Sequence, residues 1–193
     1  MNTSNITVPQ ILGDFIQNLP SSQEYLILSF SPSSIPLRQR WRNNCLSADF
    51  LADYLSTFFL GNNDRQPDSD KQAEVKSAVS YIANELLENG MKYSTQMSPF
   101  PISIQIHLNP DLIVFQLTNS IPANRTQQFK SYIQTLLNSD PNELYITQLE
   151  KNEESGLGLL TMLNDYGVKL GWKFESLSQS TEMAVTTMVQ LGI

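Results

Sequence analysis

The feature that most constrains the fold is one long amphipathic segment in the middle of the chain. Within residues 71–93 the apolar side chains recur at helical spacing, at Val75, Val79, Ile82 and Leu86. This spacing places them on one face of a helix, so the segment predicts a helix that buries one side against other elements. Two alternating segments follow it directly, which indicates a domain that combines helices with a sheet.

Alternating or β-branched segments predict five strands, at residues 24–30, 102–108, 112–118, 168–175 and 183–191. The turn Asn109-Pro-Asp111 joins the second and third strands into a β-hairpin. A further helix is predicted over residues 37–60, with an amphipathic pattern at Leu46, Phe50, Asp53 and Tyr54. The polar stretch 122–153 is also helical in tendency, and Pro141 interrupts it.

The remaining segments are polar. Residues 1–22 predict an N-terminal arm, or a short helix from Ile11 to Leu19, and residues 61–70 predict a loop because they contain no apolar residue. We expect residues 23–193 to form a single domain, since 193 residues suit one domain with appendages.

Composition excludes several classes of partner. The net charge is −7 and no cluster of Lys or Arg occurs, so nucleic acid and anionic membranes are poor partners. Cys45 is the single cysteine, which rules out an internal disulfide and fits a reducing compartment. The first twenty residues do not resemble a signal peptide, and no apolar run is long enough to span a bilayer. We therefore expect a cytoplasmic protein.

The helix at 71–93 carries the first candidate site. Glu85, Asn89 and Lys92 stand at i, i+4 and i+7, so they share one helix face. An amide oxygen can bind Mg²⁺, a carboxylate one turn earlier can accept a proton, and a lysine can neutralise phosphate charge. By itself this segment is better explained by a solvated helix face with a Glu88–Lys92 pair.

The second candidate site is Ser155-Gly-Leu-Gly158, which precedes a short helix that we expect to end at Gly167. Glycines at a helix start let backbone N–H groups approach an anion closely, and the helix dipole favours negative charge there. This pattern is weak alone because many such glycines only form a turn.

In this order, the two stretches resemble the motifs of the GHKL ATPase superfamily, which includes the kinase core of sensor histidine kinases. Glu85-Leu-Leu-Glu-Asn89-Gly-Met-Lys92-Tyr93 resembles the N box, and Gly156-Leu-Gly158-Leu159 resembles the second glycine box. The likeness covers roughly residues 71–193.

The resemblance implies an α+β, two-layer sandwich of the Bergerat type, with a mixed, mostly antiparallel sheet and helices on one face. ATP or ADP with Mg²⁺ would lie between the helix layer and a lid at residues 120–155. Asn89 would bind the metal, and the nucleotide contacts implied are Asn89, Lys92, Tyr93, Asn119, Gly156, Leu157, Gly158 and Leu159.

Within the superfamily the chain is similar to stand-alone serine kinases that act as anti-sigma factors in partner-switching systems. Glu85 matches the position of their catalytic base, which favours phosphate transfer to Ser or Thr of a small STAS-like partner protein. One departure is the first glycine box, where Asn119-Ser-Ile-Pro-Ala123 replaces the pattern Asp-x-Gly-x-Gly. Asn119 then stands where an Asp accepts a hydrogen bond from adenine.

Two other functions remain open. The chain could be a binding module that sequesters a partner without catalysis, or its pocket could hold a flavin dinucleotide beside Trp41, Tyr93 and Trp172. Other residues have plainer explanations. The only histidine, His107, fits an ordinary strand position, and Glu153-Glu154 flank the lid. Arg38, Arg40 and Arg42 fit a solvated helix start, whereas Phe58-Phe59 fit either the core or a homodimer contact.

Overall fold

The computed structural model describes residues 8–20, 22, 24–32, 37–59, 69–95, 98–151, 156–177 and 180–193, with the side chains of 37–41 and 69 left out. It contains a sheet of six strands, β1 Gln10–Gly13, β2 Glu24–Phe30, β3 Ile102–Asn109, β4 Leu112–Pro122, β5 Lys169–Ser176 and β6 Glu182–Gly192. The helices are α1 Leu37–Ser56, the short 3-10 helix η1 Thr57–Phe59, α2 Ser69–Tyr93, α3 Ala123–Asn138, α4 Pro141–Glu150 and α5 Leu157–Tyr166.

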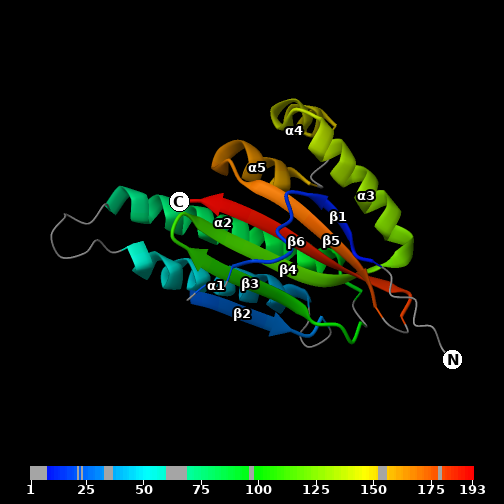
Figure 1. The fold of residues 1–193 in the computed structure, drawn as a ribbon, viewed down its shortest axis with the longest axis horizontal. Coiled ribbons are helices and arrows are strands. Elements are labelled where there is room, and N and C mark those ends of the chain that lie inside the picture. The colour runs from blue at the N-terminus through cyan, green and yellow to red at the C-terminus, as the bar shows by residue number, and fades with distance from the viewer. Residues whose placement is uncertain are drawn as a thin grey trace.

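The strand order is β1-β5-β6-β4-β3-β2, and each of the five pairings is antiparallel. Figure 1 shows the long strands β4 and β6 at the centre of this sheet, with α2 running beside them. The predicted α+β, two-layer architecture is therefore confirmed, and the five strands predicted from alternation are all present.

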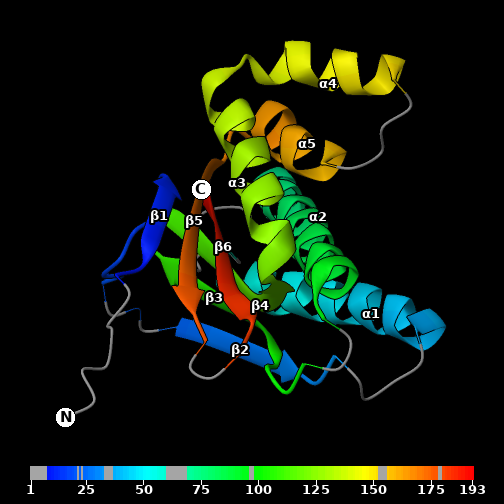
Figure 2. The same ribbon diagram turned by 90° about the vertical axis from the view of Figure 1, so that its right-hand side faces the viewer.

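The helices α1 and α2 lie on one side of the sheet (Figure 2). The stripe predicted on α2 is buried, because Val75, Val79, Ile82 and Leu86 all face the core. The close approach of α2 to the sheet depends on Gly90, where an added Cβ would lie 2.8 Å from Leu117 Cδ2. Glycine thus sets the distance between the two layers at the C-terminal end of α2.

The face that α1 buries differs from the predicted one. Its core side consists of Ala48, Leu51, Ala52 and Leu55, whereas Leu46 and Phe50 are exposed, and Tyr54 is half-buried. The small Ala48 and Ala52 allow α1 to pack closely against α2. The predicted amphipathic pattern at Leu46, Phe50, Asp53 and Tyr54 was therefore wrong as a description of the core face.

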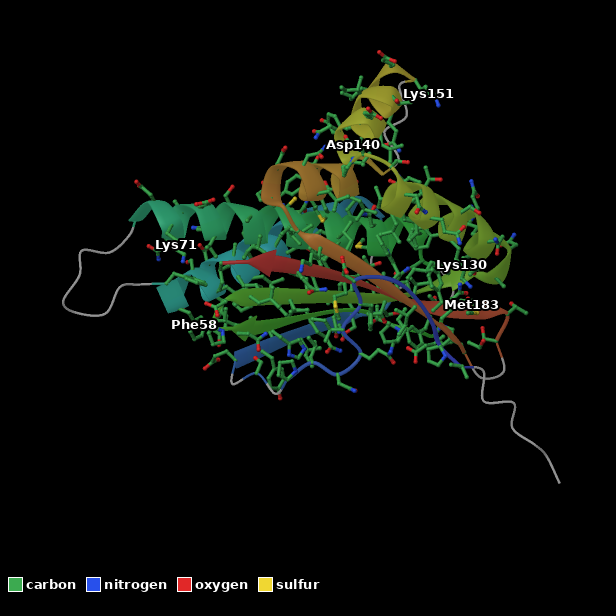
Figure 3. All side chains as sticks on the ribbon, turned by 45° about the horizontal axis from the view of Figure 1, so that its top comes forward. Phe58, Lys71, Lys130, Asp140, Lys151 and Met183 are labelled. Atoms are coloured by element: carbon green, nitrogen blue, oxygen red, sulfur yellow. The ribbon has the colours of Figure 1, made fainter. Side chains whose placement is uncertain are left out.

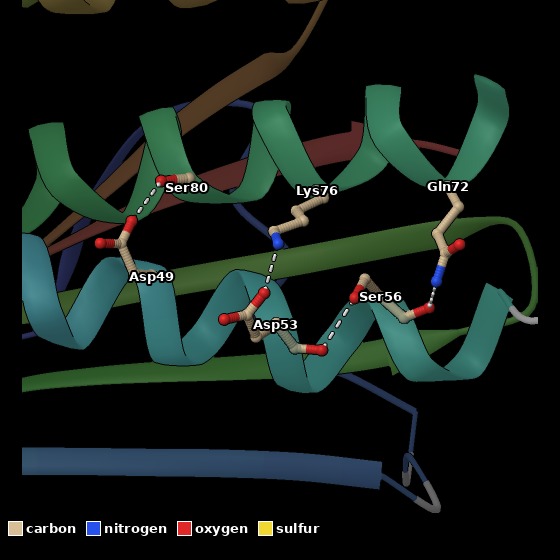
Figure 4. Close-up of polar contacts among 6 residues, drawn as sticks. All are labelled: Asp49, Asp53, Ser56, Gln72, Lys76 and Ser80. Carbon is tan, nitrogen blue, oxygen red and sulfur yellow. Dashed lines mark hydrogen bonds and ion pairs between the residues drawn. The ribbon is translucent and has the colours of Figure 1, made fainter. Parts of the chain in front are cut away.

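Polar contacts tie α1 to α2 along one side of α1 (Figure 4). Lys76 Nζ lies 2.5 Å from Asp53 Oδ1, Ser80 donates to Asp49 at 3.3 Å, and Gln72 donates to the Ser56 carbonyl at 3.1 Å. The Lys76–Asp53 pair is exposed, so it contributes little to stability. The pair shows instead how α1 is oriented, because both Asp49 and Asp53 are directed toward α2.

The N-terminal segment contributes a strand, and the short helix predicted from Ile11 to Leu19 is wrong. Gln10–Gly13 pairs with β5 at the edge of the sheet. Asp14 and Phe15 then cross the other face of β5, where an added Cβ at Gly171 would lie 2.5 Å from Phe15 N. The β-branched and apolar run that forms β1 is too short to show the alternation on which a strand prediction depends.

The segment after β4 is helical, as predicted, and Pro141 divides it. Asp140 caps α4 by accepting from the backbone N–H groups of Asn142 and Glu143, and Pro141 occupies the first helical turn, where its missing N–H costs nothing. Figure 3 shows α4, between Asp140 and Lys151, projecting from the body of the domain. The lid region thus contains two ordered helices, α3 and α4.

No helix in the described part of the chain is both long and apolar enough to cross a membrane. Several predicted features lie outside the described residues: the loop over residues 61–68, the acidic pair Glu153-Glu154, Ser155 of the glycine loop, and the side chains of Arg38, Arg40 and Trp41. His107 is half-buried on β3, where it stacks on Tyr25, and burial lowers the pKa of its imidazole.

Candidate functional site

A cavity of about 450 Å³ lies between the sheet, α2, α3 and the start of α5. Its volume falls within the range of roughly 300–1,000 Å³ that small-molecule sites occupy. The lining residues are Leu86, Asn89, Gly90, Tyr93, Leu117, Asn119, Ile121, Arg125, Gln128, Phe129, Tyr132, Gly156, Leu159, Trp172 and Thr187. Residues of six elements, α2, β4, α3, α5, β5 and β6, therefore converge on one space.

The sheet supplies polar groups to this cavity from three neighbouring strands. Trp172 on β5 pairs with Thr187 on β6, and Thr187 in turn pairs with Leu117 on β4, two residues before Asn119. Asn119 is buried, and its Nδ2 donates to the Ser120 carbonyl at 3.4 Å. The indole Nε1 of the fully buried Trp172 has no hydrogen-bond partner among the described residues.

An unpaired buried donor costs free energy, and most such groups in native proteins are paired with protein or water. Trp172 Nε1 belongs to a residue that lines a cavity large enough for a ligand. Asn119 and Thr187 also line the cavity, so its sheet side contains an amide and a hydroxyl as well as the indole.

One side of the cavity is the C-terminal half of α2, where Asn89, Gly90 and Tyr93 line the space. Of the predicted helix face of Glu85, Asn89 and Lys92, only Asn89 lines the cavity. Lys92 is exposed, outside the lining residues, with its ammonium 5.5 Å from the centre of the Tyr93 ring. Glu85 also lies outside the lining, one turn before Asn89.

The opposite side is a single face of α3. Arg125, Gln128, Phe129 and Tyr132 follow the spacing i, i+3, i+4 and i+7, which places four side chains on one stripe of a helix. These residues were not predicted from the sequence, because residues 122–153 were interpreted only as a polar stretch with helical tendency. The helical periodicity beginning at Arg125 was the available signal.

The glycine loop closes the cavity at the start of α5. Gly156 has φ +90°, a conformation that side chains rarely allow, and Leu160 N donates to its carbonyl at 3.3 Å. Tyr132 donates from its hydroxyl to the same carbonyl at 3.3 Å, and an added Cβ at Gly156 would overlap that hydroxyl. At its far end α5 stops at Gly167, as predicted, and Gly167 has the left-handed conformation.

The second glycine of the loop contacts the other candidate group. An added Cβ at Gly158 would overlap the carboxylate of Glu85, so these two residues lie directly against each other. Glu85 is half-buried, and burial raises the pKa of its carboxyl; the nearby Glu88 raises it further, whereas Lys92 opposes both effects. The structure therefore brings the α2 motif and the glycine loop together at Glu85 and Gly158.

Of the nine residues predicted for the site, five line the cavity: Asn89, Tyr93, Asn119, Gly156 and Leu159. Glu85, Lys92, Leu157 and Gly158 do not line it. Their roles, like those of the five, remain predictions.

No group of three or more His, Cys, Asp and Glu side chains in the described ranges could hold a metal ion. Asn89 is the single protein ligand that was predicted for Mg²⁺. Mg²⁺ commonly keeps several waters and takes one or two protein oxygens together with substrate phosphates, so such a site is compatible with Mg²⁺ carried by a nucleotide.

No protein-family model matches the sequence, and comparison with curated proteins also gives no match. Among solved structures, the chain is similar to a chain in the crystal structure of the SiaB-SiaC complex from Pseudomonas aeruginosa. The TM-score is 0.53, and the match covers 87% of this chain and 89% of that one at 17% sequence identity. At this identity the likeness concerns the fold alone.

Proposed function

We propose that this protein binds ATP or ADP with Mg²⁺ in the cavity and transfers phosphate to Ser or Thr of a small STAS-like partner protein in a partner-switching system. The observation that carries the proposal is the convergence of Asn89 on α2, Asn119 on β4 and Gly156 at the start of α5 on one cavity of about 450 Å³. Asn89 and Gly156 come from the two motifs that resemble those of GHKL ATPases, and Asn119 stands at the position of the first glycine box.

The cavity suits the two halves of a nucleotide. Trp172 Nε1, Asn119 and Thr187 offer hydrogen bonds to a base, and Tyr93 and Phe129 offer aromatic surface. The backbone N–H groups at the start of α5 follow Gly156, which has no side chain, and they favour an anion. Arg125 is the one Lys or Arg side chain among the lining residues.

The proposed reaction forms a bond between the hydroxyl oxygen of the partner and the γ-phosphorus, while the bond from that phosphorus to the β-phosphate oxygen breaks. Mg²⁺ would supply neutralisation of phosphate charge when bound. Glu85 would accept the hydroxyl proton on its carboxylate, and burial favours this role because it raises the proton affinity of the group.

The position of Glu85 agrees with this role. A base for an incoming hydroxyl must lie beside the phosphates but within reach of a second protein. Glu85 is one helical turn from Asn89, outside the cavity lining, and against Gly158 of the glycine loop. It is thus placed at the boundary between the proposed nucleotide and its surroundings.

A protein partner is supported by the structural neighbour, which was crystallised as a complex of two proteins, SiaB and SiaC. The test is phosphate transfer from labelled ATP to candidate partners encoded beside this protein. Transfer to a serine or threonine of one partner is the expected result. The absence of transfer to every candidate, with nucleotide bound, would contradict the kinase activity.

One observation favours the second candidate, a binding module without catalysis. Asn119, Ser120 and Ile121 replace the first glycine box within strand β4, and the whole segment to Pro122 pairs with β6. The lid therefore starts from a rigid strand. Nucleotide binding without transfer, combined with stable capture of the partner, would establish this alternative; a yellow purified protein would instead indicate a flavin.

A further inference from the structure

We propose that strand β1 is a detachable latch for helix α3: docked β1 holds α3 over the cavity, and release of β1 opens the cavity. The latch itself does not depend on what the cavity binds, and only its effect on nucleotide exchange rests on the proposed function. The strand Gln10–Gly13 pairs with β5 at one edge of the sheet, and α3 contacts it there. Figure 2 shows β1 beside β5, with α3 close to both.

The position of α3 depends in part on β1. The elements that α3 mainly contacts are β4, β6 and β1. The stripe of α3 from Arg125 to Tyr132 borders the cavity, so this side of the helix has fewer packing contacts than a fully buried face would have. An element with few packing contacts opens more readily than the core does. Loss of β1 therefore removes one of the main supports of a helix that already borders a cavity.

Two contacts join β1 to α3 directly. Lys130 Nζ donates to Gln10 Oε1 at 2.6 Å, and the same ammonium lies 4.8 Å from the centre of the Phe174 ring. At the other end of the strand, an added Cβ at Gly13 would lie 3.3 Å from Leu137 Cδ2, so the glycine allows Leu137 to approach. Lys130 and Leu137 are two helical turns apart, so β1 contacts α3 along its length rather than at a single point.

The residues that pair with β1 connect it to the wall of the cavity. Gln10 pairs with Phe174 and Leu12 pairs with Trp172, and both of these β5 side chains are fully buried. Trp172 lines the cavity itself. The ring of Phe174 meets the ring of Phe129, a lining residue of α3, edge to face at 6.0 Å between centroids. A change in the position of β1 is therefore transmitted to the sheet side and to the α3 side of the cavity.

β1 is attached less firmly than the chain that follows it. None of its four residues is buried, and β5 is its one partner among the described strands. Asp14 is held on two sides, because its N–H donates to the Leu170 carbonyl at 2.8 Å and its carbonyl accepts from the Gln190 side chain. Gly13, with φ +66°, lies at the boundary between the two segments. A glycine changes its backbone angles at little cost, so Gly13 suits a hinge about which β1 moves while Asp14 stays in place.

Movement of α3 would control access to the cavity, because its stripe forms one side of that space. Elements that close over a ligand often set the rate at which the ligand leaves. We therefore expect slow nucleotide exchange with β1 docked and fast exchange with β1 released.

Two release variants test the latch without any nucleotide. Gly13→Val should detach β1, because an added Cβ would lie 2.5 Å from the backbone oxygen of Leu170 and the residue has positive φ. Lys130→Met removes the hydrogen bond to Gln10 and keeps the aliphatic stem. Both variants should retain the circular dichroism of the fold and speed hydrogen exchange in α3, by roughly two- to tenfold for Lys130→Met.

Each release variant has a matched control. Gly192→Val introduces the same side chain where there is open space, and Lys169→Met removes an exposed lysine of β5 beyond its pairing with β1. Neither should change exchange in α3. A second readout is the emission of Trp172 in a Trp41→Phe background, which should shift to longer wavelength when β1 leaves. Unchanged α3 exchange and unchanged emission in both release variants would overturn the latch.

A disulfide tests the docked state. The bond from Asp14 N to the Leu170 carbonyl makes that pair hydrogen-bonded, so by alternation Ile11 and Lys173 form a non-hydrogen-bonded pair. The Cα atoms of such a pair lie about 4.5 Å apart, which a disulfide can span. In a Cys45→Ser background, Ile11→Cys with Lys173→Cys should form this bond on oxidation. The oxidised form should then show slower exchange in α3 than the reduced form does.

The latch and the nucleotide site can fail separately in this experiment. Equal α3 exchange in the oxidised and reduced forms would overturn the latch, whatever the nucleotide result. Release of a fluorescent ATP analogue, chased with excess ATP, should be slower in the oxidised form and faster in Gly13→Val. If α3 exchange responds to the disulfide but the analogue does not bind, the latch is supported and the proposed function is contradicted.

Discussion

The carboxylate of Glu85 on α2 lies directly against Gly158 in the first turn of α5, with no room for a side chain between them. This contact joins two motifs that are more than seventy residues apart in the sequence. Because a flexible carboxylate rather than backbone fills the space, a small change at Gly158 should move Glu85 without unfolding the protein. The role of Glu85 as the proton acceptor can therefore be tested by substituting either Glu85 or Gly158.

The first prediction compares Glu85→Gln with Gly158→Ala. Glu85→Gln keeps the shape of the side chain and removes the proton acceptor, so transfer should fall by about 10²–10⁴-fold while ATP affinity changes by a few-fold at most. Gly158→Ala displaces the same carboxylate, so it should also lower single-turnover transfer. Parental transfer rates in Glu85→Gln would show that another group accepts the proton.

The second prediction concerns pH. The pKa of Glu85 is raised by burial, so the folded protein holds this proton more tightly than the unfolded chain does. The resulting stabilisation is fully present below the ordinary value of 4.5 and is lost as the pH rises through the folded-state pKa. Thermal melts of the parental protein and Glu85→Gln should therefore show the variant gaining relative stability as the pH rises from 4.5 through the raised pKa of Glu85. A constant difference between them would contradict the raised pKa.

The transfer rate should rise with pH, whereas the stabilisation that protonated Glu85 gives falls with pH. Only the ionised carboxylate can accept a proton, so transfer should increase with pH through the raised pKa of Glu85. Glu85→Gln should lack this limb of the pH profile.

The third prediction concerns Gly156. A valine at this position would have to adopt φ +90°, and its side chain would overlap the hydroxyl of Tyr132. Gly156→Val should abolish nucleotide binding and leave the far-ultraviolet circular dichroism of the sheet unchanged. Gly167→Ala is a matched control, since it also has positive φ but has open space around it, so it should cost stability and keep binding. Normal affinity in Gly156→Val would exclude this loop as the phosphate site.

How far the sequence predicts this molecule can be judged from particular residues. The stripe on α2 and the β3–β4 hairpin were predictable because their apolar side chains repeat with the period of a single element. The face that α1 buries was not, since Leu46, Phe50 and Tyr54 have the same spacing as a core stripe. Only the tertiary arrangement makes Ala48 and Leu51 the buried residues.

The candidate site also combines residues that the sequence could predict with residues that it could not. Asn89 and Gly156 lie within recognisable local motifs, so each could be proposed from the sequence. Trp172 and Thr187 join the cavity through strand register, which no local pattern records. The α3 face beginning at Arg125 has a helical periodicity in the sequence, but that periodicity does not show which element the face packs against. Strand β1 was missed for a related reason, because four residues are too few for alternation to be distinguished from helical spacing.

The fourth prediction uses the unpaired indole of Trp172. If a bound base accepts a hydrogen bond from Nε1, Trp172→Phe should weaken nucleotide binding by about tenfold, or roughly 1.4 kcal/mol. Phe115→Leu is the control, because Phe115 is equally buried but does not line the cavity. It should lower the melting temperature and leave the affinity unchanged. Equal affinity losses in both variants would indicate a general packing effect.

The most direct test of the central claim is calorimetric titration of the ligand-free protein with ATP, with and without Mg²⁺, alongside Asn89→Ala. Asn89 is the one predicted metal ligand, and its side chain lines the cavity. We expect binding by the parental protein that is strengthened by Mg²⁺, and loss of that metal-dependent gain in Asn89→Ala. No binding heat from folded, ligand-free parental protein at any tested temperature with Mg²⁺ present would contradict the claim that this cavity is a nucleotide site.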